Sequence, residues 1–429
     1  MRVLIIGAGT GGLCLAHGLK KAGVDVALFE RDRTPRSMLI GYRVGISSDG
    51  SKALHSCLPP DVFAEFIRTT ARPATRINMR TEKYKELLVA ELPQQVDPRH
   101  SENSVSRIAM RTALLNGLDD VVQFDKTFTH FSRNDDGTVT AFFADGTSET
   151  GDVLVGADGA QSKVRKQYLP HAKVVDTGIS SIAGKLPLTP ETVKLLPPEA
   201  DGGVTLLYGP KGAFVIIHVM RFDGTGVEDD YIMWGYAIAH DKLPDLKGLD
   251  GDQLKQAVLD ATPKYHPNLR EMVRLADPET VFEIRIRTSE KLQPWKSSNV
   301  TMIGDSVHLM TPGRGIGANT ALRDAELLCR KLTEASRGKD LITAISEYER
   351  EMIEYGFEAV LASREQMDSS GAVHKPVIGR VALAMFRTFL RVVNRVPALK
   401  RRMMAKENER RDHVDRPEVD SADEVVHAG

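Results

Sequence analysis

The sequence predicts an α/β fold in which a parallel β-sheet is combined with a second, largely antiparallel sheet. Three observations predict it. The chain begins with a strand, a glycine-rich turn, a helix and a second strand. Its middle contains strand-like runs separated by Gly, Pro and Asp turns. Further on, an apolar strand at Val300–Ile303 precedes a helix starting near Ala318.

The first βαβ unit is defined by its apolar spacing. Arg2–Ile6 has the continuous apolar character of a strand buried on both faces. Thr10–Ala22 places Leu13, Ala16 and Leu19 at helical spacing, and Gly23 follows as a C-cap. Val24–Glu30 is the next predicted strand. Two strands joined through a helix predict parallel pairing.

The middle of the chain has a different pattern. Val139–Phe143, the turn Asp145-Gly146 and Asp152–Val155 together show the residues of a hairpin. Later runs with strand character indicate an antiparallel sheet. They are Val204–Tyr208, Phe214–Val219, Tyr231–Ala239 and Thr280–Arg287.

The nucleotide-binding domain is therefore predicted to be discontinuous, comprising residues 1–70, 101–175 and 281–370. Residues 71–100 and 176–280 form the second domain, 371–411 a helical segment, and 412–429 a polar, disordered tail. Within the helical segment, Pro376–Arg402 is amphipathic. We favour a helix packed across the two domains over peripheral membrane contact through its arginines.

Composition excludes several classes of protein. The 429 residues carry a net charge of −1, which argues against a nucleic-acid binder. The three cysteines form no C-x-x-C pair, so neither a disulfide framework nor a metal site is expected. No run of apolar residues is long enough to span a membrane. These features favour a cytoplasmic protein in a reducing compartment.

The first motif is Gly7-Ala8-Gly9-Thr10-Gly11-Gly12, a G-x-G-x-x-G string between strand and helix. In this Rossmann-type context, Gly7 allows the tight turn, Gly9 the approach of a pyrophosphate, and Gly12 close helix packing. The helix N-terminus favours phosphate. Glu30 ends the second strand, where its carboxylate suits ribose hydroxyls. The acid favours FAD or NAD over NADP.

Two further motifs follow strands. Gly156–Arg165 (GADGAQSKVR) follows Asp152–Val155, and Gly304–Asn319 (GDSVHLMTPGRGIGAN) follows Val300–Ile303. With the first motif, this ordered set resembles the class A flavoprotein monooxygenases, a family that includes para-hydroxybenzoate hydroxylase and the tetracycline-inactivating monooxygenases. The resemblance extends from Met1 to about Leu332.

The resemblance implies roles for individual residues. Asp305 would bind the ribityl chain of FAD. Gly315, Gly317 and Ala318, in the loop Pro312–Asn319, would place backbone N–H groups against the flavin ring.

Arg107, at a helix start, and Arg43 would also contact the cofactor. Asp158 would belong to a motif shared by FAD and the nicotinamide, although a purely structural turn is a serious alternative. Arg165 would form a salt bridge in that motif, and His308 is expected to be structural.

The sequence contains no second G-x-G-x-x-G, so NADPH or NADH is expected to bind only transiently. The predicted function is insertion of one oxygen atom from O₂ into an aromatic or polycyclic small molecule. The reaction would be hydroxylation, epoxidation or Baeyer–Villiger oxidation, in secondary metabolism or xenobiotic inactivation. The alternatives are a flavin dehydrogenase or reductase and a non-catalytic protein of the GDP-dissociation-inhibitor type. No catalytic side chain can be identified from the sequence.

Overall fold

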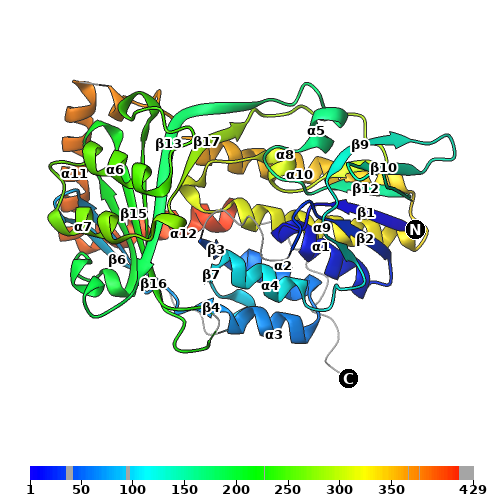
Figure 1. Cartoon of the computed structure of the whole chain (residues 1–429), viewed down its shortest axis with the longest axis horizontal. Coiled ribbons are helices and arrows are strands. Elements are labelled where there is room, and N and C mark those ends of the chain that lie inside the picture. Colours follow the sequence, from blue (N-terminus) through cyan, green and yellow to red (C-terminus); the bar gives the residue numbers. More distant parts are fainter. Residues whose placement is uncertain (35–41, 93–96, 227, 366, 376, 415–429) are drawn as a thin grey trace.

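The computed structural model describes residues 1–34, 42–92, 97–226, 228–365, 367–375 and 377–414. Two large sheets lie at opposite ends of the molecule, with long helices between them (Figure 1). The predicted combination of a parallel and a largely antiparallel sheet is confirmed.

The first sheet is parallel throughout and has the strand order β18-β12-β1-β2-β8. Its central strands are buried on both faces, and from Val3 to Ile6 no residue is more than 3% exposed. The strands are β1 (Arg2–Ile6), β2 (Asp25–Phe29), β8 (Val122–Gln123), β12 (Val153–Gly156) and β18 (Val300–Met302).

The second sheet has seven strands in the order β17-β13-β16-β15-β14-β5-β6. All neighbours are antiparallel except β14 and β5, which run parallel. The strands are β5 (Arg76–Thr81), β6 (Glu86–Glu91), β13 (Val174–Pro187), β14 (Gly203–Tyr208), β15 (Phe214–Met220), β16 (Tyr231–Ala239) and β17 (Phe282–Ser289). Helices α6 (Gly251–Ala261) and α7 (Pro267–Leu275) pack on one face and share its apolar core.

Two smaller sheets contain the other strands of the described residues. One joins β3 (Arg43–Ile46), β7 (Asn103–Ser106) and β4 (Thr70–Ala71). The other joins β9 (Phe128–Arg133), β10 (Val139–Phe143) and β11 (Ser148–Gly151).

The remaining α-helices include the long pair in the middle of Figure 1, α9 and α10, which contact each other. Their bounds are α1 (Thr10–Lys21), α2 (Ser48–Cys57), α3 (Pro60–Arg68), α4 (Arg107–Leu115), α5 (Lys163–Tyr168), α8 (Asp305–His308), α9 (Gly317–Ser336), α10 (Leu341–Arg364), α11 (Ile378–Arg395) and α12 (Pro397–Val414). Short 3₁₀ helices are η1 (Pro98–His100), η2 (Thr192–Leu195), η3 (Ala200–Gly202), η4 (Pro210–Gly212), η5 (His240–Lys242), η6 (Pro278–Thr280), η7 (Pro312–Arg314) and η8 (Ala372–His374).

The predicted hairpin partner of Val139–Phe143 was wrong. β10 pairs with β11 across the Asp145-Gly146 turn, whereas β12 lies beside β1 in the parallel sheet. The apolar residues of β12 explain this, because they are buried on both faces, whereas β11 alternates with exposed residues. The boundaries of the two domains stay a prediction.

The predicted continuous helix across residues 376–402 is two helices. Pro397 lacks the N–H needed to continue α11 and instead begins α12. α11 contacts β6, at the edge of the seven-stranded sheet, and α12 contacts α10. Within the described residues, no helix is both long enough and apolar enough to cross a bilayer. Most of the predicted tail, from 415 onward, lies outside the described residues, and 412–414 end α12.

Candidate active site

A cavity of about 2370 Å³ lies where the motifs of the parallel sheet meet the seven-stranded sheet. Eight of the predicted cofactor residues line it. They are Gly9, Gly12, Arg43, Arg107, Asp305, Gly315, Gly317 and Ala318. Gly7, Glu30 and Asp158 are not among its lining residues.

The glycine-rich turn between β1 and α1 is formed by close backbone contacts. Gly7 has φ +113°, and a Cβ added there would lie 2.4 Å from the carbonyl oxygen of Ala157. A Cβ on Gly12 would lie 2.1 Å from the oxygen of Gly7. Gly9 is different, because a Cβ there would meet nothing within 4 Å. The fold itself therefore requires Gly7 and Gly12, whereas the space at Gly9 is available to a bound group.

The N-terminus of α1 provides donors for such a group. Gly9 is the N-cap residue and offers no side-chain hydrogen bond, and the first turn contains no acidic residue. Thr10 and Gly11 also line the cavity. Backbone N–H groups and the helix dipole make this edge suitable for a pyrophosphate.

Glu30 is buried beside this turn, with 8% of its surface exposed. Its carboxylate accepts hydrogen bonds from the backbone N–H groups of Ala8 (2.7 Å) and Asp32 (2.9 Å). The guanidinium of Arg111 lies 3.8 Å away and forms a 2.8 Å ion pair with Asp32. Glu30 therefore stabilises the turn, and its contact with a ribose stays a prediction.

Arg43 and Arg107 enter the cavity from neighbouring elements. Arg43 lies in β3 and donates from Nε (3.0 Å) and Nη2 (2.9 Å) to the hydroxyl of Ser104 in β7. Arg107 begins α4, and its backbone N–H donates to the carbonyl of Tyr42 (2.8 Å). Both guanidinium groups bring positive charge to a cavity that also contains Asp305.

Asp305 begins the one-turn helix α8 after β18, and its side chain is accessible from the cavity. The side chain is exposed to the cavity, but the cavity walls enclose it, and this desolvation raises the pKa of the carboxyl, while the nearby charges of His308, Arg107 and Arg165 act in the opposite direction. Within the described residues, the carboxylate accepts no hydrogen bond from the protein. It is therefore free to accept hydrogen bonds from a hydroxyl-rich ligand.

The loop after α8 leads into α9. Gly315 has φ +67°, and a Cβ there would contact nothing within 4 Å, so the backbone is open on that side. Gly317 and Ala318 form the first turn of α9, which has no side-chain cap. Their N–H groups are positioned as donors at the cavity wall.

His308 belongs to a buried polar cluster. Its Nε2 lies 2.7 Å from Oδ2 of Asp324, and both side chains are 0% exposed. Although burial alone would lower the pKa of His308, its partner Asp324 raises it above the usual value. Asp324 also accepts hydrogen bonds from the N–H of Gly304 (2.7 Å) and the hydroxyl of Tyr355 (2.6 Å). His308 thus holds the end of α8 against Asp324 of α9, which also contacts Tyr355 of α10.

The second motif connects to the third. Asp158 accepts hydrogen bonds from the N–H groups of Lys163 (2.7 Å) and Val164 (3.3 Å), which supports its structural alternative. The predicted salt bridge of Arg165 was wrong. Its guanidinium donates to the carbonyls of Ser306 in α8 (2.8 Å) and of Ala160 (2.8 Å), and these carbonyls, not a carboxylate, satisfy it among the described residues.

The cavity wall opposite the motifs is the face of the seven-stranded sheet that α6 and α7 leave uncovered. Alternate residues of each strand point into the cavity and are mostly apolar. They include Ile77, Met79, Ile179, Val204, Leu206, Phe214, Ile216, Met233, Phe282, Ile284 and Ile286. This wall suits a flat apolar molecule.

A family model described as an FAD binding domain matches residues 1–362. The chain belongs to this FAD-binding domain family. FAD is therefore the cofactor, and the resemblance to class A flavoprotein monooxygenases is confirmed. The open backbone at Gly9 and Gly315 and the acceptor Asp305 fit a group with a pyrophosphate, a flat ring and hydroxyls.

Solved structures of this FAD-binding family resemble the chain over most of its length. A protein from Photorhabdus luminescens described as an FAD-containing monooxygenase is 37% identical, with a TM-score of 0.78. The likeness covers 86% of this chain and 98% of that one. Klebsiella pneumoniae HpxO, solved with FAD and uric acid, is 23% identical (TM-score 0.74, covering 90% and 93%) and shares the fold.

Among curated relatives, a dual O-methyltransferase/FAD-dependent monooxygenase of Cercospora beticola is 33% identical over 82% of this chain and 44% of its own length. The chain spans about half the length of the first such relatives that it matches.

Sequence reasoning missed Asn319 as a functional position. Its amide donates to the carbonyl of Gly45 (3.0 Å) and accepts from the N–H of Ser47 (2.8 Å), so it joins α9 to the end of β3. Its place at the end of the third motif was the available signal. His218 in β15 also lines the cavity, and no motif marks it.

Proposed function

We propose that this protein is an FAD-dependent monooxygenase that uses NADPH or NADH and O₂ to insert one oxygen atom into an aromatic or polycyclic small molecule. The observation that carries the proposal is one continuous cavity lined by the glycine-rich motifs on one side and an apolar sheet on the other. A cofactor and an organic substrate would share that space.

The residues that would hold FAD come from all three parts of the site. The N-terminus of α1 at Gly9 would bind the pyrophosphate, and Asp305 would accept hydrogen bonds from the ribityl hydroxyls. The loop at Gly315 and the first turn of α9 would support the flavin ring. Bound FAD supplies the redox chemistry between the nicotinamide and O₂.

The protein's own contribution is placement and charge. The N–H groups and dipole at the start of α9 favour negative charge beside them. Arg43 and Arg107 add positive charge at the same cavity. The apolar sheet wall excludes water from the reacting face. No side chain is assigned a proton-transfer role.

An isotope experiment tests the proposal. Purified FAD-loaded protein is screened with NADPH and NADH against aromatic compounds and polyketides, and any product is formed under ¹⁸O₂. One labelled oxygen atom per product supports monooxygenation. An oxidised product without label would instead support a flavin dehydrogenase or reductase, the alternative on this fold.

Two further expectations accompany the proposal. The single G-x-G-x-x-G motif predicts that a nicotinamide visits without remaining bound. The three cysteines carry free thiols, which fits a cytoplasmic location.

A further inference from the structure

The sheet wall of the cavity is almost entirely apolar, but β15 places a histidine on it. His218 lies on the same face as Phe214 and Ile216, which also line the cavity. Its neighbours in register are Val204 of β14 and Met233 of β16. An imidazole in this setting is the exception that needs a physical reason.

The ring of His218 is only 2% exposed, and neither Nδ1 nor Nε2 has a hydrogen-bond partner among the described residues. A buried polar group without a partner is costly, and removal of its water is not compensated. Such a group is usually retained in a fold only where another partner satisfies it and offsets this cost, such as a ligand in the adjoining space.

The ring is neutral at ordinary pH. Burial lowers the pKa of His218 well below its usual value, and the positive charge of Arg43 lowers it further, while a contact with the backbone of Val219, outside normal hydrogen-bond geometry, acts more weakly in the opposite direction. A neutral imidazole has one N–H donor and one acceptor nitrogen. That combination matches a hydroxyl group, which can accept one hydrogen bond and donate another.

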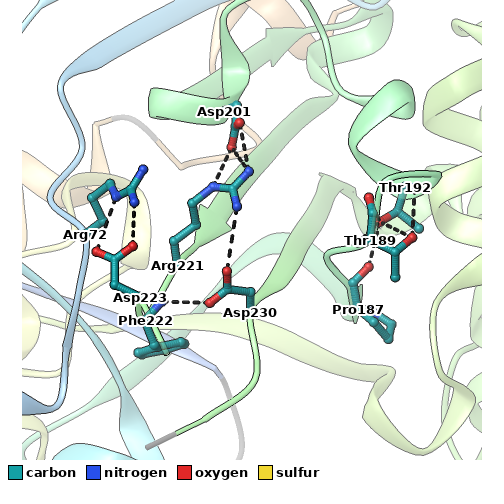
Figure 2. Close-up of polar contacts among 9 residues, drawn as sticks. All are labelled: Arg72, Pro187, Thr189, Thr192, Asp201, Arg221, Phe222, Asp223 and Asp230. Atoms are coloured by element: carbon teal, nitrogen blue, oxygen red, sulfur yellow. Dashed lines mark hydrogen bonds and ion pairs between the residues drawn. The ribbon is translucent and has the colours of Figure 1, made fainter. Parts of the chain in front are cut away.

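The strand that carries His218 is held firmly at its end. Arg221, directly after β15, donates to both carboxylate oxygens of Asp201 (2.9 and 2.8 Å) and lies 3.7 Å from Asp230 (Figure 2). The N–H of Phe222 also donates to Asp230 (2.8 Å), and Arg72 pairs with Asp223 (Figure 2). These contacts fix the backbone at the end of β15, the strand that carries His218.

We propose that His218 is a substrate-positioning residue that hydrogen-bonds a hydroxyl group on an otherwise apolar, cyclic substrate, such as a hydroxylated arene. The proposal rests on the proposed function, because it assigns the substrate side of the same cavity. Met233, which flanks the ring and lines the cavity, is unbranched and can move to admit the hydroxyl.

The test compares two probes of nearly equal shape, 2-naphthol and 2-methylnaphthalene, which differ by a hydroxyl in place of a methyl group. Their dissociation constants are measured by calorimetry on oxidised, FAD-loaded protein. Wild type should bind 2-naphthol about tenfold more tightly or better, because an unpaired buried partner costs about 1–3 kcal/mol. Equal affinities, or no saturable binding of 2-naphthol, would overturn the proposal.

Variants of His218 then test whether this side chain causes the preference for 2-naphthol. His218→Phe keeps a ring of similar shape and should reduce the preference to about twofold or less. His218→Gln keeps a donor and an acceptor and should retain part of it. If His218→Phe does not retain FAD, His218→Leu provides a second apolar replacement. An unchanged preference in the apolar variant would show that His218 does not make the contact.

Thr205→Val is the matched control. Thr205 is also fully buried with an unpartnered hydroxyl, but it lies in β14 between Val204 and Leu206 and so faces away from the cavity. Its variant should keep the wild-type preference, and a loss equal to that of His218→Phe would contradict the assignment. The binding assay needs neither nicotinamide nor O₂. The preference for 2-naphthol can therefore be absent in a protein that incorporates ¹⁸O, or present in a protein that does not, so the two proposals fail independently.

Discussion

Asp305→Ala should weaken FAD binding without destabilising the apoprotein. The carboxylate faces the cavity and accepts no hydrogen bond from the described residues, so its removal leaves no protein donor unsatisfied. Its burial and the neighbouring charge of Asp324 both disfavour the ionised form in the absence of a ligand. The cost of the substitution should therefore appear only when FAD is bound.

The magnitude follows from the lost acceptors. Leaving buried hydroxyl donors unsatisfied costs about 1–3 kcal/mol, which corresponds to roughly a 5- to 150-fold loss of FAD affinity. At a fixed excess of FAD, each tenfold loss removes about 1.4 kcal/mol of ligand-linked stability. The FAD-induced increase in Tm should shrink by a few degrees, on the order of 1–2 °C per kcal/mol, because the shift per kcal/mol falls with chain length.

The assay is a titration of apoprotein with FAD, followed by flavin fluorescence, together with melting curves with and without FAD. His308→Ala is the control with the opposite signature. Its loss leaves the buried carboxylate of Asp324 without its 2.7 Å partner, so the apoprotein should melt earlier while the folded protein keeps near wild-type FAD affinity. Wild-type affinity in Asp305→Ala would refute the placement of the third motif on the flavin.

The remaining predictions concern the turn and the buried acids. Gly9→Ala should leave the apoprotein melting temperature unchanged and reduce FAD affinity. Gly12→Ala should instead lower the yield of folded protein, because its Cβ would lie 2.1 Å from a backbone oxygen. Similar melting curves for both variants would argue against this distinction. Glu30→Gln should lower both stability and FAD affinity, because the carboxylate accepts two backbone N–H bonds at the turn; an unaltered melting temperature would contradict its role there. Burial raises the pKa of Glu349 to about 7, against the hydrogen bonds from Ser297 and Thr301. Since the folded state holds this proton more tightly than the unfolded state, stability is fully present below about pH 4.5 and is lost as pH rises towards 7. Glu349→Gln should remove that loss, which amounts to about 3 kcal/mol, and denaturant melts of both proteins at pH 5 and pH 8 would show it.

Local chemistry made the first βαβ unit predictable. The run Arg2–Ile6 is a short apolar strand, and the glycine string follows it directly. Gly12 is required by a local contact, because its Cβ would lie 2.1 Å from the oxygen of Gly7. In contrast, β13 was not predicted, although it is the longest strand. It contains Gly178, Gly184 and several polar residues, and it forms because β16 and β17 pair with it on both sides. Such pairing is tertiary and leaves little local pattern.

The candidate site also contains some residues that the sequence predicts and others that depend on tertiary packing. Asp305 and Gly315 could be placed in one site because they belong to one motif. The partners of Glu30 could not be predicted, because they depend on how Arg111 of α4 packs beside the turn. His218 was missed for a related reason. Its strand was predicted, but only the packed sheet determines which face meets the cavity.

The parallel pairing of β5 with β14 has a consequence for synthesis of the chain. Arg76 pairs with Gly203, 127 residues later, so at about 5–20 residues per second the β5–β6 hairpin waits roughly 6–25 s for its partner on the ribosome. Its outer strand, β6, stays a sheet edge until α11 is made, when the side chain of Asn394 accepts a hydrogen bond from the N–H of Val89 (3.2 Å). An open edge invites pairing with other chains. Helix α11, synthesised long after β6, thus protects the edge of that strand, and nascent or truncated chains that end before α11 should be the aggregating species in expression.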